Sequence, residues 1–416
     1  MPSEDLVGGR PRLDFLHGLR GIAALTIVLY HCALNTGPET AGPIQRVLQA
    51  PLLHGHLAVP VFLVLSGFLL AIPIVTNGLA LRGGIRCFMS RRARRILPPY
   101  YAAYLLDMIF CAVMYRLLPL LGRDPGPVIL QQMETGYRWP SVAGHLLLIQ
   151  NMSSAWNTGA SGALWTIACE WQIYLFFAAV LVPLWQRYGL MAMLAASTLA
   201  GLAITGACAR GWLFYLIPWM IIIFALGAAA TTIVFGSTAR AASMRNLPWG
   251  AITASTCALL VAGVWLLDAT APLTTPVSIP VKYYYVPIWI MWMYDMLAAV
   301  AAASLIVWLA VGRLPDAREG AIARRIRQSL ESQQVIGLGL FAYSLYLTHI
   351  IVILFWLEAT RFLAPHPVLH RVTIMLGAPL LSLLIGYLFH LCFERRWMSC
   401  ETRGMFTAES YPAQRS

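Results

Sequence analysis

Arg20 and His31 lie eleven residues apart in the first long apolar stretch of the chain. At about 100° per residue, this spacing places both side chains on one face of a helix, about 16 Å apart along its axis. A guanidinium suits a phosphate-bearing ligand, and a neutral imidazole suits a general base that takes the proton of a hydroxyl group. The alternatives are a topology anchor for Arg20 and a hydrogen-bonded packing residue for His31.

Ser66 and Glu170 are predicted to lie in two other apolar stretches, at nearly the depth of His31. A carboxylate there could hold the His31 imidazole in one tautomer and stabilise its protonated form, as the acid of a catalytic triad does. The alternatives are a Ser66 hydroxyl bonded to its own helix backbone, and a Glu170 that pairs with another helix or stays protonated in apolar surroundings.

A basic loop between residues 82 and 95 contains six arginines. Clustered guanidiniums bind phosphate groups bidentately, so the loop is a candidate site for a ligand that carries several phosphates. A purely topological role, or binding to anionic lipids, would suit the same arginines.

The elements that must position these side chains are membrane-spanning helices. Of the 416 residues, 59% are hydrophobic and only 11% are charged, and the mean hydropathy is +0.70. A water-soluble surface cannot be built from so few charges. Apolar stretches of about 18 residues or more recur along the chain, each long enough to cross a hydrocarbon core of about 30 Å as a helix. We therefore predict an all-α, polytopic transmembrane bundle, because backbone polar groups in lipid have to bond within their own segment.

Ten spans are predicted, and the arginines between them indicate their orientation. The spans cover residues 19–36, 57–77, 97–121, 163–186, 189–208, 211–234, 249–268, 286–311, 335–358 and 372–393. Arginine-rich loops stay in the cytoplasm, and most of the 29 basic residues fall on the cytoplasmic side if both termini are inside. The apolar stretch 143–151 is too short to span, and we expect an interfacial or re-entrant segment there.

The composition also bounds the domains and partners. We expect one transmembrane domain over residues 1–398, a short polar cytoplasmic tail over residues 399–416, and no appended soluble catalytic domain. The first apolar run lacks a small-residue cleavage site, so it is interpreted as a retained helix. The net charge of +12 comes from basic residues between apolar runs, which predicts no nucleic-acid partner. The eight cysteines form no CxxC pair, so neither a disulfide framework nor a metal site is expected.

Four patches of sequence resemble, in the same order, the integral-membrane acyltransferase-3 family, whose members move acyl groups from acyl-coenzyme A to hydroxyls on sugars. They are LHGLRGIAALTIVLYH, with the family's hallmark of arginine, ten residues and histidine; VPVFLVLSGFLLA with the later RRARRILPPYY; GALWTIACEWQIYLFF; and FAYSLYLTHIIV. The chain departs from the family at His17, where relatives often have an aspartate. It departs again after Glu394 and Arg395, where Arg396 replaces the usual proline, and we expect a structural role for this acidic-basic pair.

The resemblance implies a role for each residue that matches the family. The implied catalytic residues are His31, Glu170 and Ser66; the residues implied to bind acyl-coenzyme A are Arg20, Arg91, Arg92, Arg95 and Tyr101; and those implied to bind the acceptor are His349, Tyr346 and Trp165. Asp295 follows the aromatic run YYYVPIWIMWMY, matches no motif, and is a further candidate to line an acceptor pocket. His349 could instead tune Glu170 or be a core histidine. An acyl-serine at Ser66 is compatible with this assignment, but single-step transfer directed by His31 is the simpler assumption.

The implied function is acylation, in the first place acetylation, of a hydroxyl on a cell-surface, exopolysaccharide or lipid-linked glycan in the bacterial cytoplasmic (inner) membrane. Acyl-coenzyme A would be a co-substrate from the cytoplasm, with no cofactor bound permanently, and the acceptor would arrive from the extracytoplasmic side. A sugar-bearing secondary metabolite such as a macrolide is the alternative acceptor. A transporter of a sugar or acyl compound is the rival from another class, although no internal repeat is visible in the sequence. Membrane lipids are expected partners, and the sequence leaves the oligomeric state open.

Overall fold

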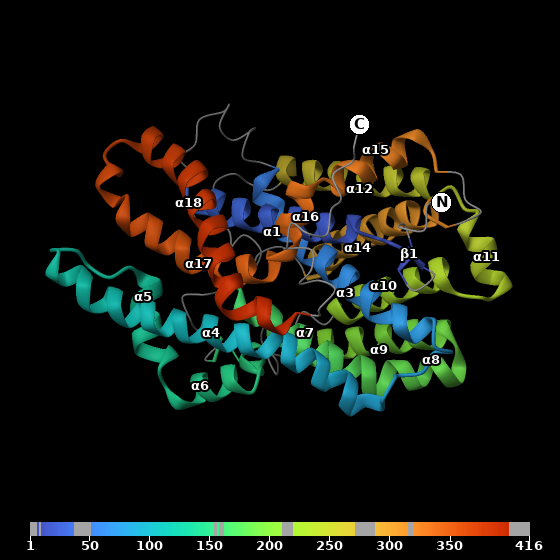
Figure 1. Ribbon diagram of the computed structural model, residues 1–416. Coiled ribbons are helices and arrows are strands. Elements are labelled where there is room, and N and C mark those ends of the chain that lie inside the picture. The colour runs from blue at the N-terminus through green and yellow to red at the C-terminus, as the bar shows by residue number, and fades with distance from the viewer. Residues whose placement is uncertain are drawn as a thin grey trace.

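The computed structural model describes eight segments of the chain, which together form a bundle of helices (Figure 1). The described residues are 6–7, 10–36, 51–153, 156–157, 162–209, 219–270, 288–314 and 319–398, with the short strands β1 (Leu6–Val7) and β2 (Arg10–Pro11) paired antiparallel at the start. The predicted tail 399–416 lies outside the described residues.

The all-α transmembrane architecture is confirmed, because a long helix corresponds to each of the ten predicted spans. They are α1 (Phe15–Leu34), α3 (Ala58–Val75), α4 (Gly84–Leu120), α7 (Leu164–Phe176) with its continuation into α8 (Val182–Tyr188), α9 (Leu190–Ala209), α10 (Met220–Phe235), α12 (Trp249–Thr270), α14 (Ile288–Val311), α17 (Ala342–Ala359) and α18 (Pro367–Phe389). Within the described residues, nine helices are long and apolar enough to cross a membrane. A tenth candidate is α10 taken together with α11 (Ala239–Arg245), to which it is bent by 95°.

Two predicted boundaries are wrong, and both errors matter for the site. Helix α4 begins at Gly84, so the arginines from Arg86 to Arg95 stand on a helix rather than in a loop. No glycine or proline interrupts residues 85–97, and arginine is a good helix former, so the helix continues outward from the apolar part. The ninth span is divided at Phe341 into α16 (Gln333–Leu340) and α17.

Glycine contacts explain how α16 lies against α1. A Cβ atom added at Gly339 would stand 1.9 Å from the backbone oxygen of His17, and one added at Gly21 would stand 2.6 Å from the backbone nitrogen of Gly339. Small residues allow two helix backbones to approach this closely inside a membrane. A glycine also lets α3 approach α10 closely, because a Cβ at Gly67 would lie 2.0 Å from the backbone oxygen of Phe224.

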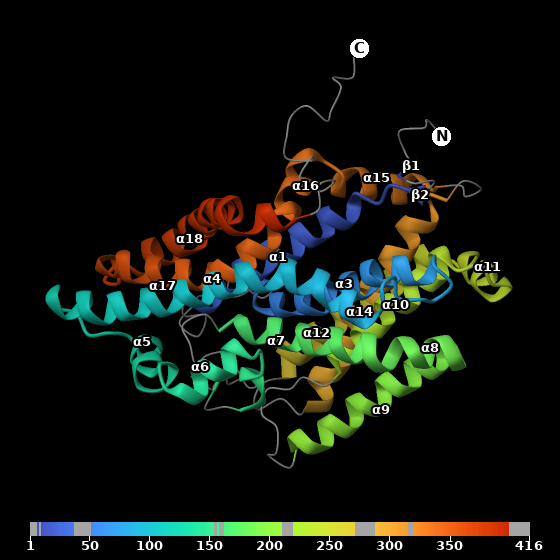
Figure 2. The same cartoon turned by 60° about the horizontal axis from the view of Figure 1, so that its bottom comes forward.

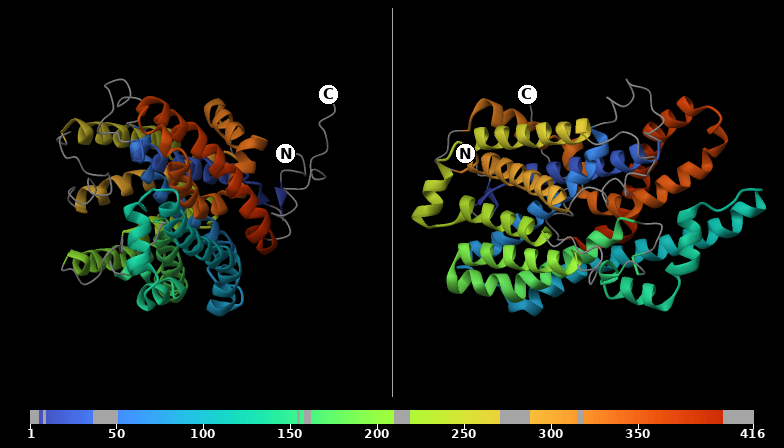
Figure 3. Two further views of the ribbon diagram at one scale, coloured as in Figure 1. Left: turned by 90° about the vertical axis from the view of Figure 1, so that its left-hand side faces the viewer. Right: turned by 180° about the vertical axis from the view of Figure 1, so that it is seen from behind.

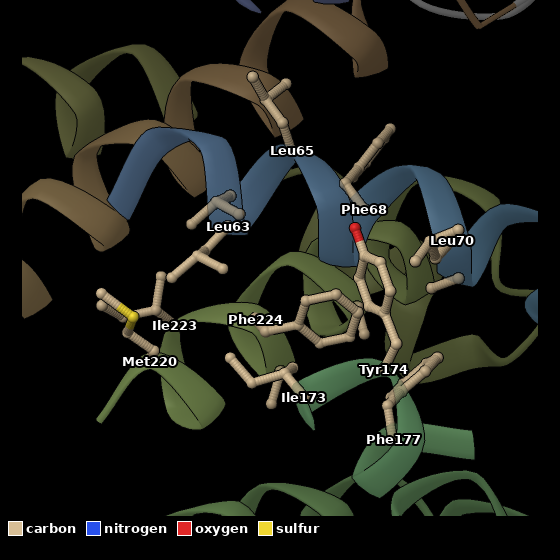
Figure 4. Packing of buried hydrophobic residues seen from close by; sticks show 14 of the residues in the cluster. Leu63, Leu65, Phe68, Leu70, Ile173, Tyr174, Phe177, Met220, Ile223 and Phe224 are labelled. Carbon is tan, nitrogen blue, oxygen red and sulfur yellow. The ribbon is translucent and has the colours of Figure 1, made fainter. Parts of the chain in front are cut away.

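The buried core lies around α3, between α7 and α10. Figure 4 shows the ring of Phe224 from α10 next to Tyr174 of α7 on one side of α3, with the hydroxyl of Tyr174 pointing toward α3, and Phe68 on the other side of α3. Large apolar side chains are exposed on the outward faces of the helices, such as Leu199 on α9 and Trp265 on α12. An apolar outer face and a packed interior are what a helix bundle in lipid requires.

The short elements gather at the two ends of the bundle. The turn between α8 and α9, α11 and α15 (Ala321–Leu330) lie at one end, and α5 (Pro127–Gln131), α6 (Trp139–Leu146) and the connection from α17 to α18 lie at the other (Figures 1 and 2). Figure 3 shows the same separation from behind. The sequence assigned the first group to the cytoplasm and the second to the outside; this orientation in the cell stays a prediction.

The short apolar stretch 143–151 forms the end of α6 and part of a 3₁₀ turn, Gln150–Met152. Its polar side chains are buried and bonded to protein: Gln150 Nε2 donates to the Tyr100 hydroxyl at 3.0 Å, and Asn151 Nδ2 donates to Gln172 Oε1 at 3.2 Å. This segment is therefore fastened to α4 and α7. Three further 3₁₀ segments are Leu52–Leu57, Arg361–Leu363 and Arg395–Trp397, and π-helical segments cover Gln132–Gly136, Phe177–Leu181 and His390–Glu394.

Candidate active site

A cavity opens between α1, α3, α4, α7 and α17. It brings together six of the residues that the sequence singled out, which come from five different helices: Arg20, Ser66, Arg92, Arg95, Glu170 and Tyr346. These residues are far apart in the chain, so only the packing of the helices makes them one site.

One end of the cavity is basic. Arg20 of α1 meets Arg92 and Arg95 of α4, which are three residues apart and therefore share a helix face. Among the described residues, none of these three guanidiniums donates a hydrogen bond or makes an ion pair within 4.0 Å. Three unpaired guanidiniums around one cavity form a site for an anionic ligand.

Arg91 is turned away from this cavity, contrary to the prediction that it binds the same ligand. It is exposed, and its guanidinium donates to the Sγ atom of Cys87 at 2.8 Å, one turn earlier on α4. The helical rotation of about 100° per residue centres Arg91 and Arg94 about 100° around the helix from Arg92 and Arg95, so Arg91, about 40° from Arg95, falls at the edge of the face that lines the cavity. The sequence prediction treated the segment as a loop and could not make this distinction.

Ser66 and Glu170 form a hydrogen-bonded pair in the wall of the cavity. The Ser66 hydroxyl donates to Glu170 Oε1 at 2.7 Å, and the Tyr174 hydroxyl donates to the same oxygen. The prediction that Glu170 holds His31 is therefore wrong for this structure, as is the alternative that Ser66 bonds to its own helix. Residues 170 and 174 are one turn apart on α7, so the carboxylate takes one partner from its own helix and the other, Ser66, from α3.

His31 takes its partner from α17. Its Nδ1 atom lies 3.2 Å from Nε2 of His349 and 3.0 Å from the backbone oxygen of Ile27. His349 is completely buried, and its Nδ1 atom lies 2.6 Å from the backbone oxygen of Tyr346. His31 is partly exposed, whereas His349 lies inside the protein.

Two aromatic rings separate the cavity from the two histidines. Phe62 and Tyr346 both line the cavity, with ring centroids 6.1 Å apart, and the Tyr346 ring lies 5.6 Å from that of His349. The Tyr346 hydroxyl is held at 2.7 Å from Thr166 Oγ1 of α7. Neither His31 nor His349 lines the cavity, and Tyr346 touches both the cavity and the His349 ring.

Three other predicted residues lie outside the cavity. The Tyr101 hydroxyl donates to the backbone oxygen of Leu146 at 2.7 Å and fastens α6. Trp165 packs against the buried core. Asp295 accepts a hydrogen bond from Trp219 Nε1 at 2.7 Å, so it joins α14 to the start of α10 instead of lining a pocket.

Sequence reasoning gave no ligand-binding or catalytic role to His17, Tyr174 and Glu394, which line the cavity. The spacing of Tyr174, four residues after Glu170, was a signal that could have found it. The structural role predicted for Glu394 fits its contacts, because it accepts from Ser344 at 2.6 Å and pairs with His390 at 2.8 Å.

Comparisons with known proteins identify the family of the chain. A family model described as acyltransferase domain matches residues 13–390. The acyltransferase MdmB of Streptomyces mycarofaciens is 30% identical over 186 residues, which cover 42% of this chain and 40% of that relative. The match to this curated relative thus spans less than half of either protein. No solved structure matches the chain.

Proposed function

The chain belongs to the acyltransferase-3 family, and from this premise we propose that it transfers an acyl group, in the first place acetyl, from acyl-coenzyme A to a hydroxyl of a carbohydrate. The observation that carries the proposal is the single cavity that joins three unpaired arginines to Ser66 and Glu170 and ends at Tyr346, beside His31 and His349. The cavity has an anion-binding end and an end beside a base, with many apolar side chains between them. This arrangement suits a donor with a phosphate-rich head and a reactive thioester.

The basic end fits the phosphates of coenzyme A, which are a 3′-phosphate and a diphosphate. Arg20, Arg92 and Arg95 would bind these groups with charge-assisted hydrogen bonds. The donor would enter from the cytoplasm, since the sequence places this end of α4 on that side. The pantetheine arm would then pass Ser66 and bring the thioester to the Tyr346 end of the cavity.

His31 would take the proton of the acceptor hydroxyl while the hydroxyl oxygen attacks the thioester carbonyl. The new ester C–O bond forms, the C–S bond breaks, and the departing thiolate receives the proton back from His31. Glu170, which accepts from Ser66 and Tyr174, would keep the middle of the cavity polar and fix the Ser66 hydroxyl. This single-step route needs no acyl-enzyme.

The acceptor would reach the partly exposed side of His31, away from the cavity. We propose a cell-surface, exopolysaccharide or lipid-linked glycan as the acceptor and the bacterial cytoplasmic membrane as the location. A sugar-bearing secondary metabolite such as a macrolide would present the same hydroxyl chemistry. Membrane lipids surround the protein in either case.

The test is release of free coenzyme A from acetyl-coenzyme A by purified protein in lipid vesicles, with and without an acceptor fraction from the cell envelope. We expect acceptor-dependent thiol release that His31→Ala lowers by about 10²–10⁴-fold, the usual contribution of a general base. The variant should be present at the normal protein level. Uptake of a sugar into vesicles without any thiol release would favour the transporter instead. Mass spectrometry of glycans and of macrolide-type metabolites, from cells with and without the protein, identifies the acceptor.

A further inference from the structure

His349 is fully buried and does not line the cavity, so it contacts neither the donor nor the acceptor in the route described above. Both of its ring nitrogens are nevertheless engaged. Nδ1 lies 2.6 Å from the backbone oxygen of Tyr346, and Nε2 lies 3.2 Å from Nδ1 of His31. A histidine with two directed contacts and no access to a ligand acts through its neighbour.

The first contact decides where the proton of His349 lies. A backbone carbonyl oxygen accepts hydrogen bonds and never donates them, so Nδ1 of His349 has to carry the hydrogen in its bond to Tyr346. In a neutral imidazole only one nitrogen is protonated. Nε2 of His349 is therefore an acceptor with a free lone pair directed at His31.

The second contact then decides the tautomer of His31. A lone pair on His349 Nε2 requires a hydrogen on Nδ1 of His31, and the carbonyl oxygen of Ile27, 3.0 Å from the same Nδ1, requires it too. Both acceptors require the hydrogen to be on Nδ1 of His31, so Nε2 of His31 is left unprotonated. A base needs a free lone pair on the nitrogen that meets the substrate.

We propose that His349 is a positioning residue that holds His31 in the tautomer with hydrogen on Nδ1, so that Nε2 is the base. The same bond keeps the ring oriented when His31 becomes an imidazolium, because Nδ1 still donates to His349. His349 thus takes the place that the sequence assigned to Glu170. The inference rests on the proposed function for its catalytic meaning, while the tautomer itself is a property of the protein alone.

Other ionisable groups near His31 do not provide this contact. The ring of Tyr30 lies 4.8 Å from that of His31 at 64°, edge to face, and His56 lies behind Tyr30, with ring centroids 5.8 Å apart. Glu170 is bonded to Ser66 and Tyr174. Among the described residues, the hydrogen-bond contacts of the His31 ring are therefore the Ile27 oxygen and His349.

The activity test compares His349→Gln with His349→Leu. A glutamine amide can still donate to the Tyr346 oxygen and accept from His31, whereas leucine can do neither. We expect His349→Gln to keep kcat within about tenfold of the wild type and His349→Leu to lower kcat by about 100-fold or more, within the range of a lost general base. The KM for acetyl-coenzyme A should change by less than about twofold in both variants, because the cavity is untouched. Thr348→Val, a neighbouring buried change on α17, controls for damage to packing.

Nitrogen NMR of the histidine-labelled wild-type protein in lipid nanodiscs gives a readout independent of activity. The chain has nine histidines, and the His31→Ala variant identifies the signals of His31. We expect hydrogen on Nδ1 and a bare Nε2 for His31, and loss of this preference in His349→Leu. A hydrogen on Nε2 of wild-type His31, or a His349→Leu variant with wild-type kcat, would overturn the proposal. Absence of thiol release in the wild type refutes the proposed function instead, and the NMR result still decides the tautomer.

Discussion

At the scale of single residues, Glu170 lines the cavity but does not have the partner that the sequence predicted. Its position in an apolar helix marked it as a functional residue, since an ionisable group there is costly without a partner. The partners are the hydroxyls of Ser66 and Tyr174 rather than His31. The site therefore has two separate polar groups, a Ser66–Glu170–Tyr174 cluster in the cavity and a His31–His349 pair beside it.

Ser66→Ala tests which chemistry the cluster performs. In the single-step route the variant loses one hydrogen bond to a carboxylate, worth about 1.5–3 kcal/mol, so we expect kcat to fall by roughly 10- to 100-fold without disappearing. Initial rates of thiol release measure this. Complete loss of transfer in a folded Ser66→Ala variant, together with an acylated Ser66 peptide in acid-quenched wild type, would show that an acyl-serine lies on the pathway.

At the scale of elements, cavity-lining and exposed arginines lie within one and a half turns of α4. Arg92 and Arg95 line the cavity, while Arg91 and Arg94 are exposed. Since the four residues have the same chemistry and stand on the same helix, their different positions on the helix surface provide matched controls.

Arg95→Gln should raise the KM for acetyl-coenzyme A by about tenfold or more, because a charge-assisted contact to phosphate is worth about 1.5–3 kcal/mol. Arg94→Gln, on the exposed face, should leave this KM unchanged. The comparison is made in vesicles at fixed salt, with acetyl-dephospho-coenzyme A as a second donor that lacks the 3′-phosphate. Equal KM values for the two variants would show that the basic part of the cavity does not bind the donor.

The crossing of α3 and α10 predicts a stability effect. A Cβ at Gly67 meets the backbone oxygen of Phe224 at 2.0 Å, so Gly67→Ala has to push two helices apart, at a cost of about 1–3 kcal/mol. Gly337 on α16 has nothing within 4 Å of its Cβ position, so Gly337→Ala should be tolerated. Thermal unfolding in detergent should show a lower midpoint for Gly67→Ala alone. Equal midpoints would mean that the crossing relaxes without cost.

At the scale of the whole molecule, the cavity is formed where broken and continuous helices meet. The division of the ninth span at Phe341 lets Gly339, Leu340 and Ala342 line the cavity. Irregular backbone at membrane depth is tolerated where it is buried in protein or lines a cavity. The orientation of the bundle in the membrane then determines from which side the donor and the acceptor arrive.

Cysteine labelling tests this orientation. Arg82→Cys lies in the connection before α4, and Leu121→Cys lies at the other end of α4, where Leu121 is 58% exposed. If the arginine-rich end is cytoplasmic, a membrane-impermeant maleimide should label Leu121→Cys in intact cells and Arg82→Cys only after permeabilisation. The wild-type chain gives the background. The reverse pattern would place the donor end of the cavity outside the cell.

The sequence by itself determined the helices, their order and the residues worth testing. Hydropathy acts over about 20 consecutive residues, so apolar runs such as 57–77 predict a span wherever the helix later packs. The ionisable residues Arg20, His31 and Glu170 stood out for the same local reason, the cost of charge in lipid.

Only the tertiary structure decided the partners. Glu170 bonds to Ser66, 104 residues away in the chain, and His31 meets His349, 318 residues away. Such contacts depend on the rotation of each helix about its axis and on its depth, and one residue of rotation turns a side chain by about 100°. Hydropathy does not specify that rotation. Close packing does specify it, through contacts such as that of Gly67 in α3 with α10 and that of Gly339 in α16 with α1.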